Sequence, residues 1–93
     1  PLPELPFGAQ VRIVSQRLGP GWHQGSIATV GDCVVVMIPE PPVDPVRLYP
    51  VDFTDVTEVQ MGDSAAARWT PVAVEPLRAK HGGCLLKWRC ALP

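Results

Sequence analysis

The sequence lacks the features that would mark a membrane protein or a common type of enzyme. Its longest uninterrupted apolar run, Cys33–Ile38, has six residues, whereas a helix that crosses a bilayer needs about 20. It contains no nucleophile with an adjacent base, no glycine-rich phosphate loop, no paired-histidine helix motif and no nucleophile elbow. We therefore expect no membrane span, no catalytic activity and no cofactor.

Charged residues are scarce as well, at 18% of the chain, while apolar residues make up 46%. This balance is far from that of disordered chains, so the 93 residues should fold as one domain with one core. The few charges are segregated along the sequence. Asp32–Asp63 contains seven acids and one base, whereas Ser64–Pro93 contains five bases and one acid. A segregated basic segment can attract phosphate or acidic peptide.

Proline is the residue in excess, with 12 prolines alongside 8 glycines. Both residues disfavour helix interiors, so a helical bundle is not expected. Three prolines fall within residues 1–6, which we predict to form an extended arm. Another cluster, Pro39–Pro45, predicts a stiff, exposed loop.

The rest of the first half has the pattern of a sheet. Gln10–Ser15 alternates apolar and polar residues, as a half-buried strand does. Trp22–Val30 predicts a strand with a bend at its internal glycine. After a two-residue turn, Cys33–Ile38 is β-branched and apolar on both faces, which is typical of a central strand. These three segments are predicted to form an antiparallel meander.

Four segments carry a resemblance to a known fold: Gly8, Val11 and Ile13, then Trp22-His23-Gln24-Gly25-Ser26-Ile27, then Val34–Val36, then Phe53–Val59. Over about residues 7–59 this pattern resembles the SH3-like small β-barrel, and the second strand is similar to that of Tudor and agenet domains. The resemblance implies an SH3-like partly open barrel of about five strands over residues 7–60. The apolar segments on either side of Lys80-His81-Gly82-Gly83 predict an added C-terminal β-hairpin in residues 61–93, so the expected fold is all-β.

A resemblance to Tudor domains implies recognition of a methylated lysine or arginine by an aromatic cage with an acidic neighbour. Aromatic faces offset the desolvation of such a cation. Trp22 matches the first cage position, and Tyr49, Phe53 and Asp55 are expected to supply the remaining walls. We therefore predict a non-catalytic interaction module that binds an extended peptide, such as a methylated histone-like tail, in an aromatic-lined groove.

An alternative interpretation is nucleic-acid binding through the predicted C-terminal hairpin. Its bases surround an aromatic residue, which is the minimal equipment for binding single strands. The residues concerned are Arg78, Lys80, Lys87, Trp88 and Arg89. The pI of about 6.1 is far below that of a dedicated nucleic-acid domain. A third alternative is a structural domain packed inside a multidomain protein or complex.

The three cysteines, Cys33, Cys84 and Cys90, are an odd number in a chain without a secretory segment. This pattern favours buried thiols in a reducing compartment, nuclear or cytoplasmic, over a disulfide framework. His81, Cys84 and Cys90 are candidate zinc ligands together with Cys33 or His23, but the spacing contains no Cys-x-x-Cys pair, which disfavours a zinc site. The chain begins with Pro1 rather than methionine, so we expect it to be part of a longer intracellular protein.

Overall fold

The computed structural model describes residues 5–40, 47–63 and 65–86. In this part of the chain, six strands precede one α-helix, and a short 3-10 helix (η1) lies between the fourth and fifth strands. The elements are β1 (Gln10–Ser15), β2 (His23–Val30), β3 (Cys33–Glu40), β4 (Arg47–Val51), η1 (Phe53–Asp55), β5 (Val56–Gly62), β6 (Trp69–Val72) and α1 (Val74–His81). The predicted strands of the meander are confirmed.

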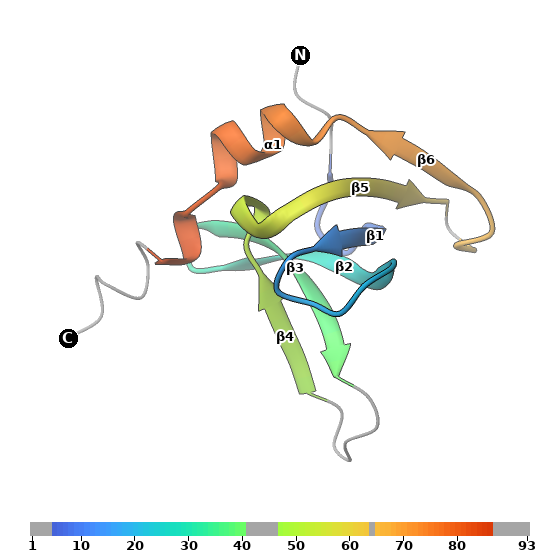
Figure 1. Ribbon diagram of the computed structural model, residues 1–93, viewed down its shortest axis with the longest axis horizontal. Helices are drawn as coiled ribbons and strands as arrows, with labels where there is room; N and C mark the ends of the chain where they lie inside the picture. Colours follow the sequence, from blue (N-terminus) through green and yellow to red (C-terminus); the bar gives the residue numbers. More distant parts are fainter. Residues whose placement is uncertain (1–4, 41–46, 64, 87–93) are drawn as a thin grey trace.

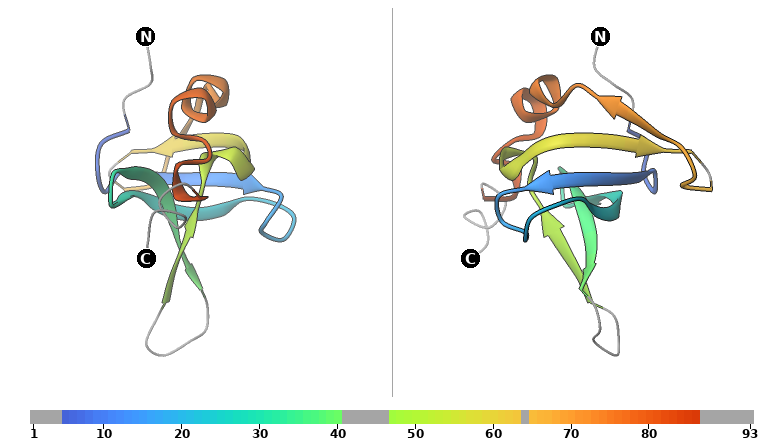
Figure 2. Two further views of the ribbon diagram at one scale, coloured as in Figure 1. Left: turned by 90° about the vertical axis from the view of Figure 1, so that its left-hand side faces the viewer. Right: turned by 45° about the vertical axis from the view of Figure 1, so that its right-hand side comes forward.

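The six strands form one antiparallel sheet in the order β4-β3-β2-β1-β5-β6. β1 to β4 form the meander, η1 turns the chain, and β5 returns to pair with β1 (Figure 1). The sheet bends, so that β3 and β4 run across the direction of β1 and β5 (Figure 2). Among the described strands, β4 and β6 remain the two edges, so the sheet is open.

The core lies on the concave side of the sheet, because alternate residues of each strand point inward. Its buried members are Val11, Ile13, Ile27, Val36, Ile38, Val51, Phe53, Val56, Val59 and Leu77. β3 is buried on its other face as well, where Val35 and Cys33 pack against Leu85. Because both faces of β3 pack against buried residues, its sequence is a continuous apolar run rather than an alternating one.

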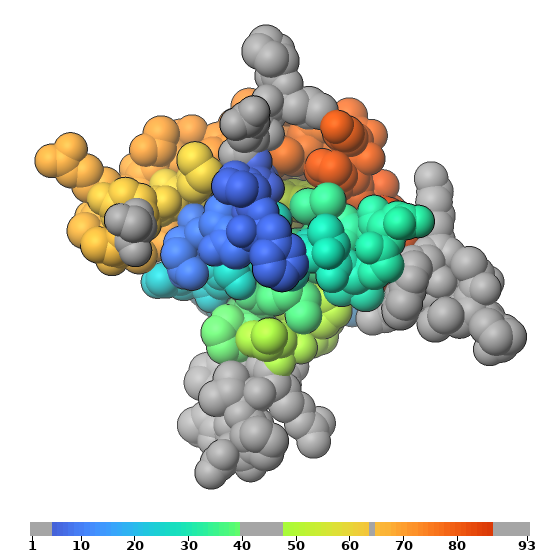
Figure 3. Space-filling view, turned by 180° about the vertical axis from the view of Figure 1, so that it is seen from behind, coloured from blue at the N-terminus to red at the C-terminus, as the bar shows by residue number. Residues whose placement is uncertain are grey.

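The segment before β1 is bound to β2. The backbone N–H of Gly8 donates to the carbonyl of Ile27 at 2.8 Å, and the N–H of Ile27 donates to Ala9 at 3.0 Å. Leu5, within the predicted arm, packs against the core. Figure 3 shows the N-terminal residues and β1 (blue) between β2–β3 (teal to green) and β5–β6 (yellow to orange). Residues 1–4 of the arm lie outside the described residues.

The predicted C-terminal β-hairpin is wrong, and with it the all-β class. Val74–His81 forms α1, and Cys84–Leu86 adds a helical turn after two glycines. The fold is mostly β, a six-stranded open sheet with a C-terminal helix. Residues 87–93, the rest of the predicted hairpin, lie outside the described part of the chain.

The helix forms despite its proline because Pro76 sits in the first turn, where the missing N–H has no intrahelical partner. Glu75 lies near the helix N-terminus and three basic residues lie near its C-terminus, which suits the helix dipole. Leu77 is buried in the core, and the helix contacts η1 and β5. These long-range contacts outweigh the strand-like alternation of residues 72–74.

Gly25, in β2, is required because strand β3 passes close to it. A Cβ at this position would meet the carbonyl oxygen of Met37 and approach Ile38 Cδ1 at 2.7 Å. Gly25→Ala should therefore lower the free energy of unfolding by about 1 to 3 kcal/mol, because strand β3 must shift to admit the methyl group. Urea unfolding followed by circular dichroism measures this loss.

Gly19→Ala is the matched control, because a Cβ there meets nothing within 4 Å and its φ is not positive. We expect it to change the free energy of unfolding by less than about 0.5 kcal/mol. Equal stability of the two variants would show that β2 and β3 do not approach each other as closely as the structure has them.

Candidate functional site

A groove of about 240 Å³ lies where four segments of the described chain meet. The loop after β1, the end of β4, η1 and the segment after α1 each contribute to it. Its lining residues are Arg17, Tyr49, Pro50, Asp52, Thr54, Asp55, Gly83, Leu85 and Leu86. Three of these parts of the chain, around residues 17, 49–55 and 83–86, are far apart in the sequence. They meet only in the folded, bent sheet.

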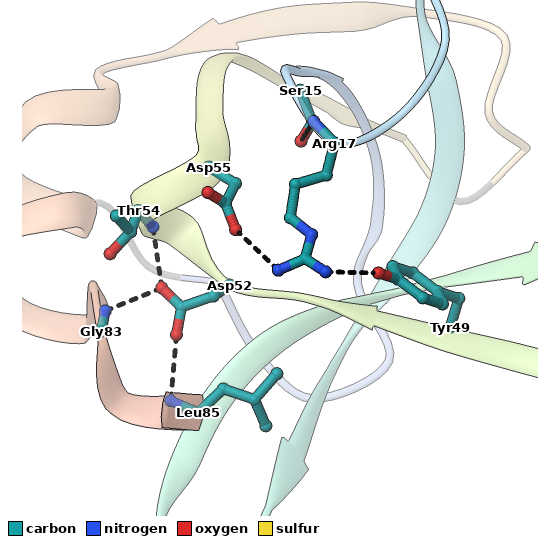
Figure 4. A network of polar contacts seen from close by, with 8 residues as sticks. All are labelled: Ser15, Arg17, Tyr49, Asp52, Thr54, Asp55, Gly83 and Leu85. Carbon is teal, nitrogen blue, oxygen red and sulfur yellow. Dashed lines mark hydrogen bonds and ion pairs between the residues drawn. The ribbon is translucent and has the colours of Figure 1, made fainter. Parts of the chain in front are cut away.

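Asp52 organises one side of the groove (Figure 4). Its Oδ1 accepts hydrogen bonds from the backbone N–H groups of Thr54 and Gly83, both at 2.8 Å. Its Oδ2 accepts one from the N–H of Leu85 at 2.9 Å. The carboxylate thus caps η1 and holds the segment after α1 at the same time.

These contacts also set the ionisation of Asp52. Burial alone would raise the pKa of the carboxyl, but the backbone hydrogen bonds from Thr54, Leu85 and Gly83 outweigh it. The pKa therefore lies below the ordinary value of 3.8. Asp52 carries a negative charge into the groove at neutral pH.

A disulfide fixes the same wall of the groove a second time. Cys33, at the start of β3, is bonded to Cys84, 51 residues later, with their Cα atoms 5.4 Å apart. Leu85, the next residue, is buried against Val35. The prediction of free buried thiols is wrong for Cys33 and Cys84. An odd number of cysteines argues against a full disulfide framework but still permits one bonded pair.

On the opposite side of the groove, Arg17 contacts both Tyr49 and Asp55 (Figure 4). Its Nη2 donates to the hydroxyl oxygen of Tyr49 at 3.1 Å, and its Nη1 lies 3.8 Å from Oδ2 of Asp55. The backbone N–H of Arg17 donates to Ser15 Oγ at 3.2 Å. Exposed ion pairs of this kind contribute little stability, so a ligand can replace either partner at small cost.

The four residues predicted for peptide binding do not converge. Tyr49 and Asp55 meet at Arg17 in the groove. Phe53 is 0% exposed in the core, with its ring centroid 6.0 Å from that of His81, so it offers no wall to a ligand. Trp22 does not line the groove and lies over Arg12 instead. An aromatic cage made of Trp22, Tyr49 and Phe53 is therefore not assembled.

Of the nine residues that line the groove, sequence reasoning placed only Tyr49 and Asp55 in a site, and it missed the charged Arg17 and Asp52 and the apolar Leu86 among others. A signal existed only for Asp52, since an aspartate two residues before a threonine often caps a turn. Its second role, holding residues 83 and 85, depends on positions 31 and 33 residues away. No local pattern predicts such contacts.

The residues of the nucleic-acid alternative are only partly described. Arg78 and Lys80 are exposed on α1, where Arg78 Nη1 lies 3.6 Å from Glu75 Oε1. Lys87, Trp88 and Arg89 lie outside the described residues. The described helix thus does not form the predicted basic hairpin.

The zinc alternative loses two of its ligands to the disulfide, since Cys33 and Cys84 are bonded to each other. His23 Nε2 contacts the carbonyl of Gly19 at 2.7 Å. Burial, and then the charge of Lys80, lower the pKa of His81 below 6.5. Cys90 is not described, and within residues 5–40, 47–63 and 65–86 no three potential ligands lie together.

Comparison of the chain with protein-family models, with curated proteins and with solved structures finds no match. None of the helices in the described residues is both long enough and apolar enough to cross a membrane.

Proposed function

We propose that the chain is a non-catalytic protein-interaction module with an SH3-like architecture. The order of elements supports this assignment, because a four-stranded meander is followed by a 3-10 helix and by a strand that returns to β1. β6 and α1 are additions to that arrangement. Small barrels of this type serve many functions, so the choice among them rests on the groove.

The shape and charge of the groove favour an extended basic peptide. Its described lining carries two carboxylates, Asp52 and Asp55, and one guanidinium, Arg17, which leaves a net negative charge. Leu86 is 67% exposed at the rim and offers an apolar contact. A basic side chain of a peptide can pair with Asp55 and lie over Tyr49, while its neighbour covers Leu86.

The methylated-tail interpretation has less support than peptide binding itself. Tyr49 is the only aromatic residue among the described residues that line the groove, and a methyl-lysine cage needs several. The Cys33–Cys84 disulfide also favours an oxidising compartment over the predicted nuclear or cytoplasmic one. We therefore propose an unmodified basic segment of a partner protein as the ligand.

The observation that carries the proposal is the convergence of Tyr49 and Asp55 on the same exposed arginine. To test it, 15N-labelled protein is titrated with blocked peptides that contain a central lysine, unmodified or trimethylated. Both peptides should shift the backbone signals of Arg17, Asp55 and Leu86. Their affinities should agree within about threefold, because one aromatic wall discriminates weakly.

Tyr49→Ala should weaken the binding of both peptides by about tenfold, through loss of the aromatic wall. Asp55→Asn should weaken it less and should flatten its salt dependence. Phe7→Ala is the control, since Phe7 is exposed outside the groove. Binding that is unaffected by Tyr49→Ala, or no shift with either peptide, would refute the proposal.

A further inference from the structure

A second cluster lies on the outer face of the sheet. The guanidinium carbon of Arg12, in β1, lies over the rings of Trp22 and Trp69, 4.8 Å from each ring centroid. Trp22 precedes β2 on one side of β1, and Trp69 begins β6 on the other side, beyond β5. None of the three residues lines the groove described above. The chain therefore places one arginine between two of its three tryptophans.

The arrangement is held in place by its neighbours. Arg12 Nε donates a hydrogen bond to Gln60 Oε1 at 2.6 Å, across the β1–β5 pair. The ring of Trp69 lies against Gly62, where a Cβ would meet ring carbon Cζ3 at 3.0 Å. Trp22 is 40% exposed. Any residue with a side chain at position 62 would push the ring of Trp69 away from Arg12.

The guanidinium retains donors for a ligand. Nε is used by Gln60, and the two amino groups of Arg12 make no hydrogen bond to any other described residue. Two parallel N–H groups match the two oxygens of a carboxylate. Because the indoles and Gln60 already fix the side chain, a ligand loses little conformational entropy on binding to it.

We propose that Arg12, between Trp22 and Trp69, binds the carboxylate of an acidic side chain on a partner protein. Because Trp22 and Trp69 come from opposite sides of β1, a ligand has to reach the open N–H groups between the two rings. A planar carboxylate fits there. A tetrahedral sulfate or phosphate directs oxygens toward the ring faces, which carry negative partial charge.

The surroundings narrow the partner sequence further. A hollow of about 220 Å³ lies beside Trp22 and is lined in part by Pro71, Val72 and Val74. It has room for an apolar side chain next to the acid. Glu58 lines the same hollow, so its charge disfavours a run of several acids. The partner segment is therefore a single glutamate or aspartate with a neighbouring apolar residue.

The test uses the indole N–H signals of Trp22 and Trp69 and the Nε–H signal of Arg12 in 15N-labelled protein. The probe is a blocked Gly-Ser peptide with a central glutamate-leucine pair. We expect saturable shifts of all three signals, and none with the peptide in which glutamine replaces glutamate. Inorganic sulfate and the phosphoserine-leucine peptide should bind at least about tenfold more weakly than the glutamate peptide.

Variants separate a carboxylate site from other uses of the same surface. Arg12→Lys should weaken binding by about tenfold, because lysine keeps the charge but loses the planar fork. Glu58→Gln, an exposed substitution that should not disturb folding, should strengthen binding about twofold by removing a repulsive charge. Arg78→Lys, on α1, is the matched control and should change nothing.

Several results would overturn the proposal. One is the absence of shifts with the glutamate peptide, and another is equal binding of the glutamine peptide or of sulfate. If a peptide with a central lysine binds instead, and Glu58→Gln weakens that binding, the surface binds cations and not carboxylates. If Arg12→Lys proves unfolded, the comparison of the peptides and the effect of Glu58→Gln still decide whether the site binds a carboxylate. Peptide binding in the groove is followed through the backbone signals of Arg17 and Leu86. The groove proposal and the Arg12 proposal can therefore fail independently.

Discussion

Replacing Cys33 and Cys84 together by alanine should lower the free energy of unfolding by about 4 kcal/mol. The bond closes a loop of 51 residues, and a cross-link of that span restricts the unfolded chain by about this amount. Domains of this size are stable by about 5 to 15 kcal/mol, so the loss is a large part of the total. Urea unfolding of the two proteins, followed by circular dichroism, measures it.

The comparison is cleanest in a Cys90→Ser background, where Cys33 and Cys84 are the only cysteines. The intact mass before and after treatment with a dithiol then shows whether the bond is present. The reduced parent should be about as unstable as the double alanine variant. Equal stability of the oxidised parent and the double variant would mean that the disulfide does not stabilise this fold.

Asp52→Asn should lower the free energy of unfolding by about 3 kcal/mol. The carboxylate accepts three backbone hydrogen bonds, and bonds to a charged acceptor are worth about 1.5 to 3 kcal/mol each. The amide of asparagine can accept only at its oxygen, so its NH₂ group faces a backbone N–H that it cannot satisfy. Asp55→Asn is the matched control and should cost less than about 1 kcal/mol, because Asp55 pairs at the surface.

The contribution of Asp52 should also depend on pH. Its pKa in the folded state is lower than the ordinary 3.8, so the folded protein binds fewer protons than the unfolded chain as acid is added. The stabilisation is complete above 3.8 and is lost as the pH falls through the lower folded-state pKa. The stability difference between the parent and Asp52→Asn should therefore shrink below about pH 4. A constant difference down to pH 2 would contradict the assigned hydrogen bonds.

The two substitutions act on the same part of the molecule and should affect the groove in the same way. Asp52 holds residues 83 and 85, and the disulfide holds residue 84 between them. Leu85 and Leu86 line the groove. The wall formed by this segment is thus fixed by one covalent bond and two hydrogen bonds. This explains how a short segment at the end of a small domain can present a defined surface.

Much of the sheet was predictable because its signals are local. Gln10–Ser15 alternates in polarity and forms β1 with the same bounds, and the apolar run from Cys33 is the start of a strand buried on both faces. Gly25 interrupts the pattern of β2 at a position where only glycine fits against β3. In each case the pattern of neighbouring residues matches the backbone that they form.

The helix and the site were harder to predict because their causes are not local. Residues 72–74 alternate like a strand, yet the burial of Leu77 against the core decides for a helix. Trp22 was predicted to be a cage wall for a cation of a partner, but its ring lies against the guanidinium of the chain's own Arg12. Phe53 was expected at the surface, and the turn at η1 directs it inward instead.

The sequence by itself determined that this chain folds and that its first half is an antiparallel meander. Only the tertiary structure decided that Cys33 is bonded to Cys84, that Asp52 holds the last described segment, and that Arg12 lies between Trp22 and Trp69. The reason is physical. Strand patterns arise from residues one or two positions apart, whereas these contacts join residues that are mostly far apart in the chain and meet only when the sheet has formed and bent.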